Sequence, residues 1–242
     1  MTQSFDIHRQ IPLPATPAEV WEAVATGAGN LGWLFPMEIE PWVGGLVSRG
    51  PGKVAVWNPP HAFSSRHESD AVTASLSYRI EAAENGSVLY PHVHRTYNQP
   101  IENFAGQQDA AEAYSDFYYH TLGEYLGHFK GRPAICVQVY GGKDSRGPDA
   151  FTVLQRALGL TDGVKVGDAL RIAPAGLPPV DVVVDYLDER FLGLRGAEGL
   201  YRFFAGNHWG ASVWLSLHLF AENLEADAIS AAWQDWILGI YA

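Results

Sequence analysis

The sequence holds a single cysteine and no apolar run long enough to cross a membrane. Cys136 stands alone among 242 residues, which excludes an internal disulfide bond. It has no cysteine or histidine neighbour at metal-ligand spacing, so we expect it to be a small buried residue on a strand. A membrane-spanning helix needs about 18–20 consecutive apolar residues, and no stretch approaches that length. The N-terminal residues alternate in polarity, unlike a signal peptide. The sequence therefore predicts a soluble cytoplasmic protein.

Basic residues are also scarce. Lysine and arginine number 16 against 27 aspartates and glutamates, which gives a formal net charge of −11. Without a basic run, such a chain is a poor partner for nucleic acid or for an anionic membrane. The sequence has no nucleophile elbow, phosphate-cradling glycine loop, dinucleotide fingerprint or zinc-finger spacing. We therefore expect no cofactor and assign no catalytic residue.

Hydrophobic and aromatic residues are plentiful instead, at 47% and 12% of the chain. Over the first hundred residues they alternate in short runs between tight turns, which is typical of an antiparallel meander. Pro91 in the last run predicts a bulge or an edge strand. The predicted strands are 4–13, 37–42, 46–49, 53–57, 62–68, 71–82 and 87–97, with turns at Gly50-Pro51-Gly52 and Asn85-Gly86.

Two helical segments interrupt this pattern. Thr16, Pro17 and Glu19 form a capping box that starts a short helix, which we expect Gly27-Ala28-Gly29-Asn30 to end. A long helix is predicted from Asp109 to Lys130, before Gly131-Arg132-Pro133 stops it. Its apolar residues recur at the spacing of one helical face, which we expect to lie across the sheet. They are Tyr114, Phe117, Tyr118, Leu122, Tyr125, Leu126 and Phe129.

A family resemblance rests on four blocks and a helical ladder. The blocks are IPLPATPAEVWEAV at 11–24, the apolar turn at 31–34, Trp42-Val43-Gly44-Gly45 and Trp57-Asn58-Pro59-Pro60; the ladder is Tyr118, Leu122 and Tyr125. Together they resemble the SRPBCC superfamily of START domains and the birch-pollen allergen. Within it the match is closest to the family related to the activator of the heat-shock-protein ATPase. The resemblance implies an α+β helix-grip fold, in which a curved antiparallel sheet wraps around a long C-terminal helix.

Residues 133–242 repeat the order strand, helix, strands, helix. In the helix predicted at 226–241, Trp233, Ile237 and Ile240 fall at the same spacing as the ladder of the first long helix. We therefore predict two tandem helix-grip domains, residues 1–132 and 133–242, of which the second has diverged. The alternative is one enlarged domain whose extra strands extend the sheet. The tyrosine hydroxyls of the first long helix favour the first domain as the functional one.

The predicted site is a cavity between the first sheet and the first long helix. Ligand cavities are mostly apolar, with a few polar groups that orient the ligand. We expect this one to bind a small hydrophobic or aromatic molecule without catalysing a reaction. The candidate lining residues are Trp42, Trp57, Phe63, Tyr78, His92, His94, Tyr114, Phe117, Tyr118 and Leu122.

A metal site is the first alternative. His92 and His94 are two residues apart on a strand, so both point to one face and share the ligand chemistry that zinc prefers. The candidate third ligands are His61, His67 and His120. No carboxylate or cysteine stands at a spacing that requires a metal, so we predict none.

Two further alternatives come from the superfamily. Some relatives act as cyclases or dehydratases on aromatic polyketides, in which a cavity side chain moves a proton. The groups available for that role are Arg9, Tyr78, His92, His94, Tyr114 and Tyr118. The family name also suggests a chaperone-associated interaction protein, although the sequence shows no separate activating domain. A homodimer is left open.

Overall fold

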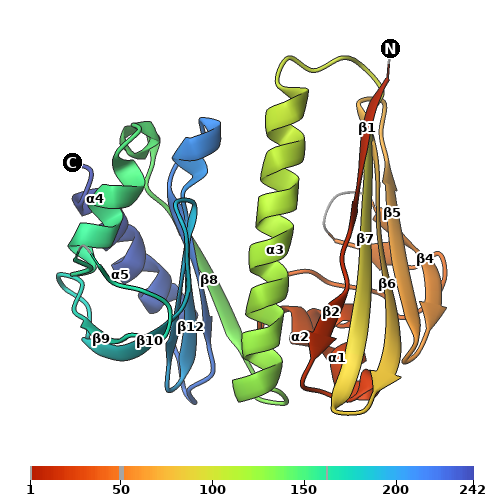
Figure 1. The fold of residues 1–242 in the computed structure, drawn as a ribbon, viewed down its shortest axis with the longest axis horizontal. Coiled ribbons are helices and arrows are strands. Elements are labelled where there is room, and N and C mark those ends of the chain that lie inside the picture. Colours follow the sequence, from red (N-terminus) through yellow and green to blue (C-terminus); the bar gives the residue numbers. More distant parts are fainter. Residues whose placement is uncertain (1, 49–51, 162) are drawn as a thin grey trace. The chain divides into compact units, whose positions relative to one another are not determined.

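The computed structural model describes residues 2–48, 52–161 and 163–242. The chain divides into two compact units, Met1–Arg132 and Pro133–Ala242. Each unit combines helices with one antiparallel sheet, so the predicted α+β class is confirmed (Figure 1). In this described part no helix is long and apolar enough to cross a membrane. Most of the turn predicted at Gly50-Pro51-Gly52 lies outside the described residues.

The first unit contains a seven-stranded sheet in the order β1-β7-β6-β5-β4-β3, with β2 also paired to β7. Its strands are β1 (Gln3–His8), β2 (Ile11–Leu13), β3 (Leu46–Val47), β4 (Gly52–Asn58), β5 (Ala62–Glu68), β6 (Val72–Ala83) and β7 (Gly86–Tyr97). Side chains alternate between the two faces. We call the face that carries buried Phe5 and Ile7 the inner face, and the face that carries exposed Asp6 and His8 the outer face.

Three helices accompany this sheet: α1 (Pro17–Ala25), α2 (Gly27–Asn30) and α3 (Phe104–His128). The predicted capping box is confirmed, because Thr16 and Glu19 bond each other's backbone N–H groups at the start of α1. The first helix ends before Gly27, as predicted, but residues 27–30 themselves form α2, which the sequence did not predict. Thr26 adopts an extended conformation between the two helices, and its hydroxyl accepts the N–H of Gly29 at 3.0 Å, which starts the new turn.

The long helix α3 starts earlier than predicted. It begins at Phe104, where the side chain of Asn103 caps it by accepting the N–H of Gly106 at 3.1 Å. Gly131, with φ of +76°, follows its end, as the sequence predicts. In Figure 1, α3 runs along the inner face of the first sheet, and it contacts β1, β2 and α1.

The predicted strand at 37–42 is wrong. Only Ile39 pairs, through a single bridge to Val47. The backbone turns instead, because Trp42 donates its N–H to the carbonyl of Glu40 at 2.9 Å. The carboxylate of Glu40 also accepts the N–H of Leu46 at 2.7 Å. Local hydrogen bonds therefore replace the ladder that the apolar pattern suggested.

The bulge or edge predicted at Pro91 is also wrong. β7 lies between β1 and β6, and its pairing with β6 passes Pro91 opposite Tyr78 without a shift of register. On its other side, the carbonyl of Pro91 accepts the N–H of Arg9 at 3.2 Å. Arg9 lies in the break between β1 and β2. Since N–H and C=O of one residue point the same way in an antiparallel strand, the missing N–H of Pro91 faces this break.

The second unit contains a six-stranded sheet in the order β8-β13-β12-β11-β10-β9. Its strands are β8 (Ile135–Tyr140), β9 (Ala169–Ile172), β10 (Val180–Leu187), β11 (Phe191–Gly196), β12 (Gly199–Phe204) and β13 (Trp214–Leu219). Its helices are α4 (Ala150–Ala157) and α5 (Ala226–Gly239), with short 3-10 turns at Lys143–Arg146 and Gly206–Trp209. Cys136 lies on β8 as predicted, and burial raises the pKa of its thiol to about 11.

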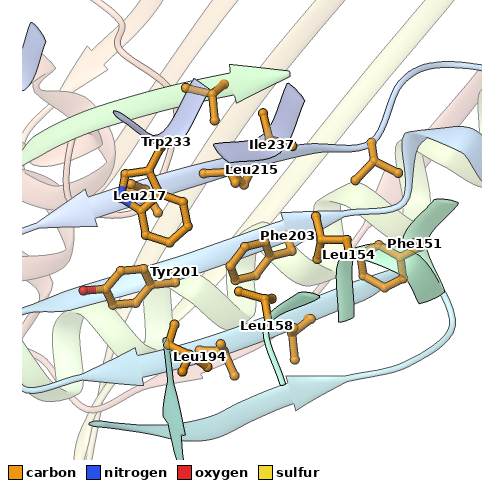
Figure 2. Packing of buried hydrophobic residues seen from close by; sticks show 14 of the residues in the cluster. Phe151, Leu154, Leu158, Leu194, Tyr201, Phe203, Leu215, Leu217, Trp233 and Ile237 are labelled. Carbon is orange, nitrogen blue, oxygen red and sulfur yellow. The ribbon is translucent and has the colours of Figure 1, made fainter. Parts of the chain in front are cut away.

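The two sheets share one strand order. In each, the first strand pairs with the last, and the remaining strands follow backwards along the sheet. Helices follow the first strand, and one helix follows the last. In the second unit, Leu194, Leu215, Leu217 and Phe203 are completely buried in the cluster that Figure 2 shows with Trp233 and Ile237 of α5.

Candidate functional site

The inner face of the first sheet is densely packed at the end near α1. Trp57 contacts Trp21 and Phe63 edge to face, with ring centroids 4.9 and 6.1 Å apart. Phe63 in turn stacks on Tyr78 at 6.1 Å. Phe63 and Tyr78 keep only 1% and 4% of their surface exposed. These rings contact one another, so at this end they form core.

Tyr119 of α3 closes this packed end. Its hydroxyl is hydrogen-bonded to Tyr78, and its ring stacks on Trp33 at 6.3 Å. The indole N–H of Trp33 donates to the carbonyl of Ala23 at 2.9 Å, which fixes the ring. Burial, followed by the neighbouring Tyr78, raises the pKa of Tyr119 well above its ordinary value. The phenol therefore stays protonated at neutral pH.

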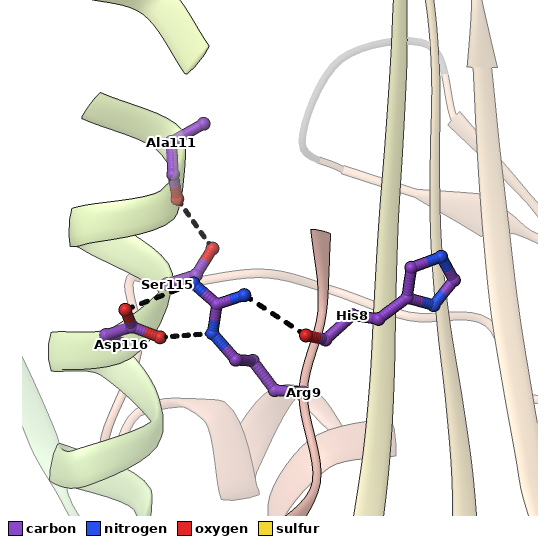
Figure 3. A network of polar contacts seen from close by, with 5 residues as sticks. All are labelled: His8, Arg9, Ala111, Ser115 and Asp116. Carbon is purple, nitrogen blue, oxygen red and sulfur yellow. Dashed lines mark hydrogen bonds and ion pairs between the residues drawn. The ribbon is translucent and has the colours of Figure 1, made fainter. Parts of the chain in front are cut away.

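An ion pair joins the sheet to α3 beside this end. The guanidinium of Arg9 donates two hydrogen bonds to the carboxylate of Asp116, at 2.6 and 3.1 Å. A third goes to the carbonyl of His8 at 3.1 Å. Figure 3 shows the Arg9 side chain directed to α3 and the ring of His8 directed away from it. The hydrogen bonds to Asp116 raise the pKa of Arg9. Arg9 thus connects the break between β1 and β2 to the helix.

The other end of the α3 contact is also aromatic. Phe104 packs against Phe5 and Tyr97, with ring centroids 6.1 Å away in each case. The helix therefore rests on the sheet through bulky rings at two places, Phe104 and Tyr119. Between them, the same helical face carries Gln108, Ala111 and Ser115, which are short or polar and only half-buried.

On β5, β6 and β7, part of the inner face of the sheet is also only half-buried, although Ile7 on β1 is buried. The residues concerned are Ser65, His67, Ala74, Leu76, Val93 and Arg95. The Nδ1 atom of His67 is itself buried but has no hydrogen-bond partner among the described residues. The side chains on both sides therefore remain partly accessible to solvent. This part of the sheet–helix interface is accordingly less closed than the packed end.

The outer face carries a separate polar group of side chains. Asp6 and His8 of β1 lie opposite His94 and His92 of β7, respectively. One carboxylate oxygen of Asp6 bonds His92 Nε2 at 2.7 Å and His94 Nδ1 at 2.9 Å. The rings of His8 and His92 stack, with centroids 4.0 Å apart. Hydrogen bonds from His92 and then His94 hold the pKa of Asp6 below its ordinary value.

A shallow groove begins at these histidines. It has a volume of about 490 Å³ and is lined on the outer face by His8, His92, Ser64, Ser77, Arg79 and Tyr90. The guanidinium of Arg79 lies 3.8 Å above the ring of Tyr90 and also pairs with Glu81. The groove therefore offers hydroxyls, one cation and a flat aromatic wall.

The residues that the sequence nominated fall into separate places. Trp57, Phe63 and Tyr78 lie on the inner face, and His92 and His94 lie on the outer face, so their side chains point to opposite sides of the sheet. Trp42 is 52% exposed in the loop before β3. Tyr114 and Tyr118 stack on each other on α3, and Tyr118 also contacts Phe35. Phe117 and Leu122 are fully buried on the same helix.

Several residues of these arrangements escaped the sequence pattern. Tyr119 lies two positions from Phe117, so the predicted apolar face excluded it. Asp6 and His8 were counted only as exposed strand residues. The alternation of side chains along β1 places Asp6 and His8 on the outer face. The pairing of β1 with β7 then brings them next to His94 and His92. Of the candidate third metal ligands, none joins His92: among the described residues only Asp6 and His8 do so.

Comparison with known proteins shows structural likeness without a family assignment. No family model matches the chain, and no curated protein matches it. DynU16, a protein of the dynemicin biosynthetic locus, is 15% identical with a TM-score of 0.43, and 97% of each chain is covered. A Rhodobacter sphaeroides protein is 22% identical over 54% of this chain and all of its own, with a TM-score of 0.41. CalU16 from Micromonospora echinospora is 15% identical over 52% of this chain and 76% of its own, with a TM-score of 0.40. These values are too low to carry a function to this chain.

Proposed function

We propose that the first unit binds a small, partly aromatic molecule between its sheet and α3, and that its fold is of the helix-grip type. The observation that carries the proposal is the pair of aromatic contacts, at Phe104 and Tyr119, on either side of short residues. Ala111 and Ser115 on the helix, and Ser65 and Ala74 on the inner face of the sheet, are small and only half-buried. A flat ligand of moderate size would replace the missing side-chain volume.

The polar groups around this space would orient such a ligand. His67 offers an unpartnered ring nitrogen on the sheet side. Arg95 lies on the same face, with its guanidinium 5.9 Å from the ring of Phe5. The Tyr119 hydroxyl stands at the packed end. This set suits an aromatic molecule that carries an oxygen acceptor, because a guanidinium and a phenol both donate hydrogen bonds.

The second unit supports the choice of the first as the binding unit. Its sheet and helices enclose a core in which Leu192, Leu194, Leu215 and Leu217 have no exposed surface. Among the described residues of this unit, no comparable half-buried stretch separates these leucines. We propose that the second unit is a diverged copy of the first, as the shared strand order suggests, and serves as a packed scaffold.

Two substitutions at neighbouring positions test the proposal. Leu76 points to the inner face and Ser77 to the outer face of β6. Leu76→Trp should fill the space below α3, whereas Ser77→Trp fills only the outer groove. Binding of a fluorescent aromatic probe such as anilinonaphthalene sulfonate should fall about tenfold or more in the first variant and stay unchanged in the second. Native mass spectrometry of the purified protein would show whether a small molecule co-purifies with it.

Equal binding in both variants and the wild type would refute the proposal. Loss of binding in Ser77→Trp alone would move the ligand to the outer groove. Circular dichroism of both variants checks that the added indole has not unfolded the unit.

A proton-transferring enzyme of the cyclase or dehydratase kind is the second candidate. The observation that favours it is the buried Tyr78–Tyr119 pair, because Tyr119, whose pKa is raised by burial, keeps its phenolic proton at neutral pH. Turnover of an aromatic polyketide-like substrate should then be lost in Tyr119→Phe and kept in His92→Ala, since His92 lies on the other face. Turnover that survives Tyr119→Phe would remove this candidate.

A further inference from the structure

The outer face of the first sheet brings three metal-ligating side chains together from two strands. Asp6 and His8 are two residues apart on β1, and His92 lies directly opposite His8 on β7. One ligand atom from each of the three lies within 4.8 Å of the other two. We propose that Asp6, His8 and His92 form a binding site for a divalent transition metal of the zinc class. The site is separate from the sheet–helix space proposed above for an organic ligand.

The spacing of these atoms is close to what a metal needs. Zinc binds imidazole nitrogen and carboxylate oxygen at about 2.0–2.2 Å in a tetrahedron, which puts neighbouring ligand atoms about 3.4 Å apart. His92 Nε2 and Asp6 Oδ1 already lie 2.7 Å apart. The remaining separations, at most 4.8 Å, close by small side-chain rotations. Asp6 and His92 are 47% and 37% exposed, so their side chains have room to rotate.

The choice of metal follows from the ligands. Imidazole nitrogens suit zinc, copper, nickel and iron, whereas magnesium and calcium prefer sites made of oxygen atoms alone. Two histidines with one carboxylate therefore favour a borderline transition metal. The stacked rings of His8 and His92 present their nitrogens side by side on adjacent strands.

His94 has the place of a positioning residue. Its Nδ1 bonds the same carboxylate oxygen of Asp6 at 2.9 Å, and its Nε2 is held by the hydroxyl of Thr96 at 2.9 Å. This series of hydrogen bonds, from Thr96 through His94 to Asp6, thus fixes the position of the carboxylate. Groups of this kind orient metal ligands and change affinity by about ten- to a hundredfold when removed.

The site faces the groove on the outer face. Three protein ligands leave a coordination position open to an external molecule. His8 and His92 both line the groove, and Arg79 lies along the same wall. A bound cation next to an arginine favours an external ligand with an anionic oxygen, such as a carboxylate or a phosphate.

Calorimetric titration of chelator-treated protein with zinc chloride alone tests this inference. We expect one zinc ion per chain in the wild type and a loss of affinity of about tenfold or more in His8→Ala and in His92→Ala. His94→Gln should give a smaller loss. His61→Ala is the matched control, because His61 is an exposed histidine on the turn between β4 and β5 and outside the cluster; it should bind as the wild type does.

Cobalt gives an independent measurement. Co²⁺ bound by two imidazoles and a carboxylate should show the visible absorption of a low-coordinate site, and this absorption should disappear in His8→Ala. Equal zinc affinity in the wild type, His8→Ala and His92→Ala would overturn the inference. None of these measurements uses an organic ligand, so the result is independent of the Leu76→Trp experiment.

Discussion

Tyr78 of β6 and Tyr119 of α3 meet across the sheet–helix interface of the first unit, where their hydroxyl groups are hydrogen-bonded. Tyr78 is 4% exposed and Tyr119 is 5% exposed, so neither hydroxyl has free access to water. A buried hydroxyl that loses its partner keeps the cost of its own desolvation. The pair therefore links the position of α3 to the position of β6.

A double-mutant cycle measures this link. Tyr78→Phe and Tyr119→Phe should each lower the free energy of unfolding by about 1–2 kcal/mol, because each removes the hydrogen bond between these two buried side chains. The double variant should lose less than the sum of the two, by about 0.5–1 kcal/mol or more. Urea unfolding followed by far-ultraviolet circular dichroism gives all three values.

Tyr90→Phe is the control for this cycle. Its ring lies on the outer face below Arg79, and the substitution keeps that ring contact while removing a hydroxyl. Its stability should match the wild type. Strict additivity of the two core substitutions would show that the hydroxyls are not coupled in solution.

The contrast between the two sheet–helix interiors makes a second prediction. Leu194 of β11 has no exposed surface, so Leu194→Ala should cost about 2–5 kcal/mol of stability through the cavity it leaves. Leu76 of β6 is half-buried. Leu76→Ala should therefore cost clearly less, below about 2 kcal/mol, in the same urea unfolding measurement. Equal losses at both positions would mean that the first interior is closed in solution.

The capping box of α1 makes a third prediction, about pH. The pKa of Glu19 is lowered below its ordinary value of 4.5 by the backbone N–H of Thr16, by Lys130 and by the Thr16 hydroxyl. A carboxyl whose pKa is lower in the folded state contributes stability above its ordinary pKa. That contribution is lost as the pH falls through the lowered value. Unfolding at a series of acidic pH values should show this loss.

Glu19→Gln tests the assignment of that acid sensitivity. The amide cannot titrate, so the variant should show a flatter dependence of stability on pH below 4.5 while starting from a lower stability at neutral pH. A pH dependence identical to that of the wild type would assign the acid sensitivity to other carboxyls.

Local signals in the sequence predicted much of the fold. The Thr16–Glu19 capping box and the alternation of β5 and β6 depend on neighbouring residues, and the structure has both. The hairpin predicted at Asn85-Gly86 also forms, but its turn residues are Glu84 and Asn85, and Gly86 begins β7. The strand at 37–42 failed for a physical reason. The alternation of Met37, Ile39 and the two glutamates has the pattern of a strand, but the carboxylate of Glu40 accepts the backbone N–H of Leu46, and the chain turns there.

The candidate sites were harder to predict, since they depend on pairing between distant segments. His92 and His94 were found from their spacing, but Asp6 and His8 joined them only through the β1–β7 register. Tyr119 was missed because one helical face was taken as the buried one, whereas both Phe117 and Tyr119 are buried. A sequence pattern specifies which residues share an element face, and it does not specify which faces meet.

Pro91 has a consequence for the arrangement of the outer face. A slip of β7 along β1 by one residue would move His92 and His94 to the inner face while Asp6 and His8 stayed on the outer face, and a slip by two would break their pairing. The pyrrolidine ring opposes both. Since it has no hydrogen to donate, it fits only opposite the break at Arg9, and any other alignment would leave a strand carbonyl without its bond. Pro91 alone thus favours one register for the whole pair of strands.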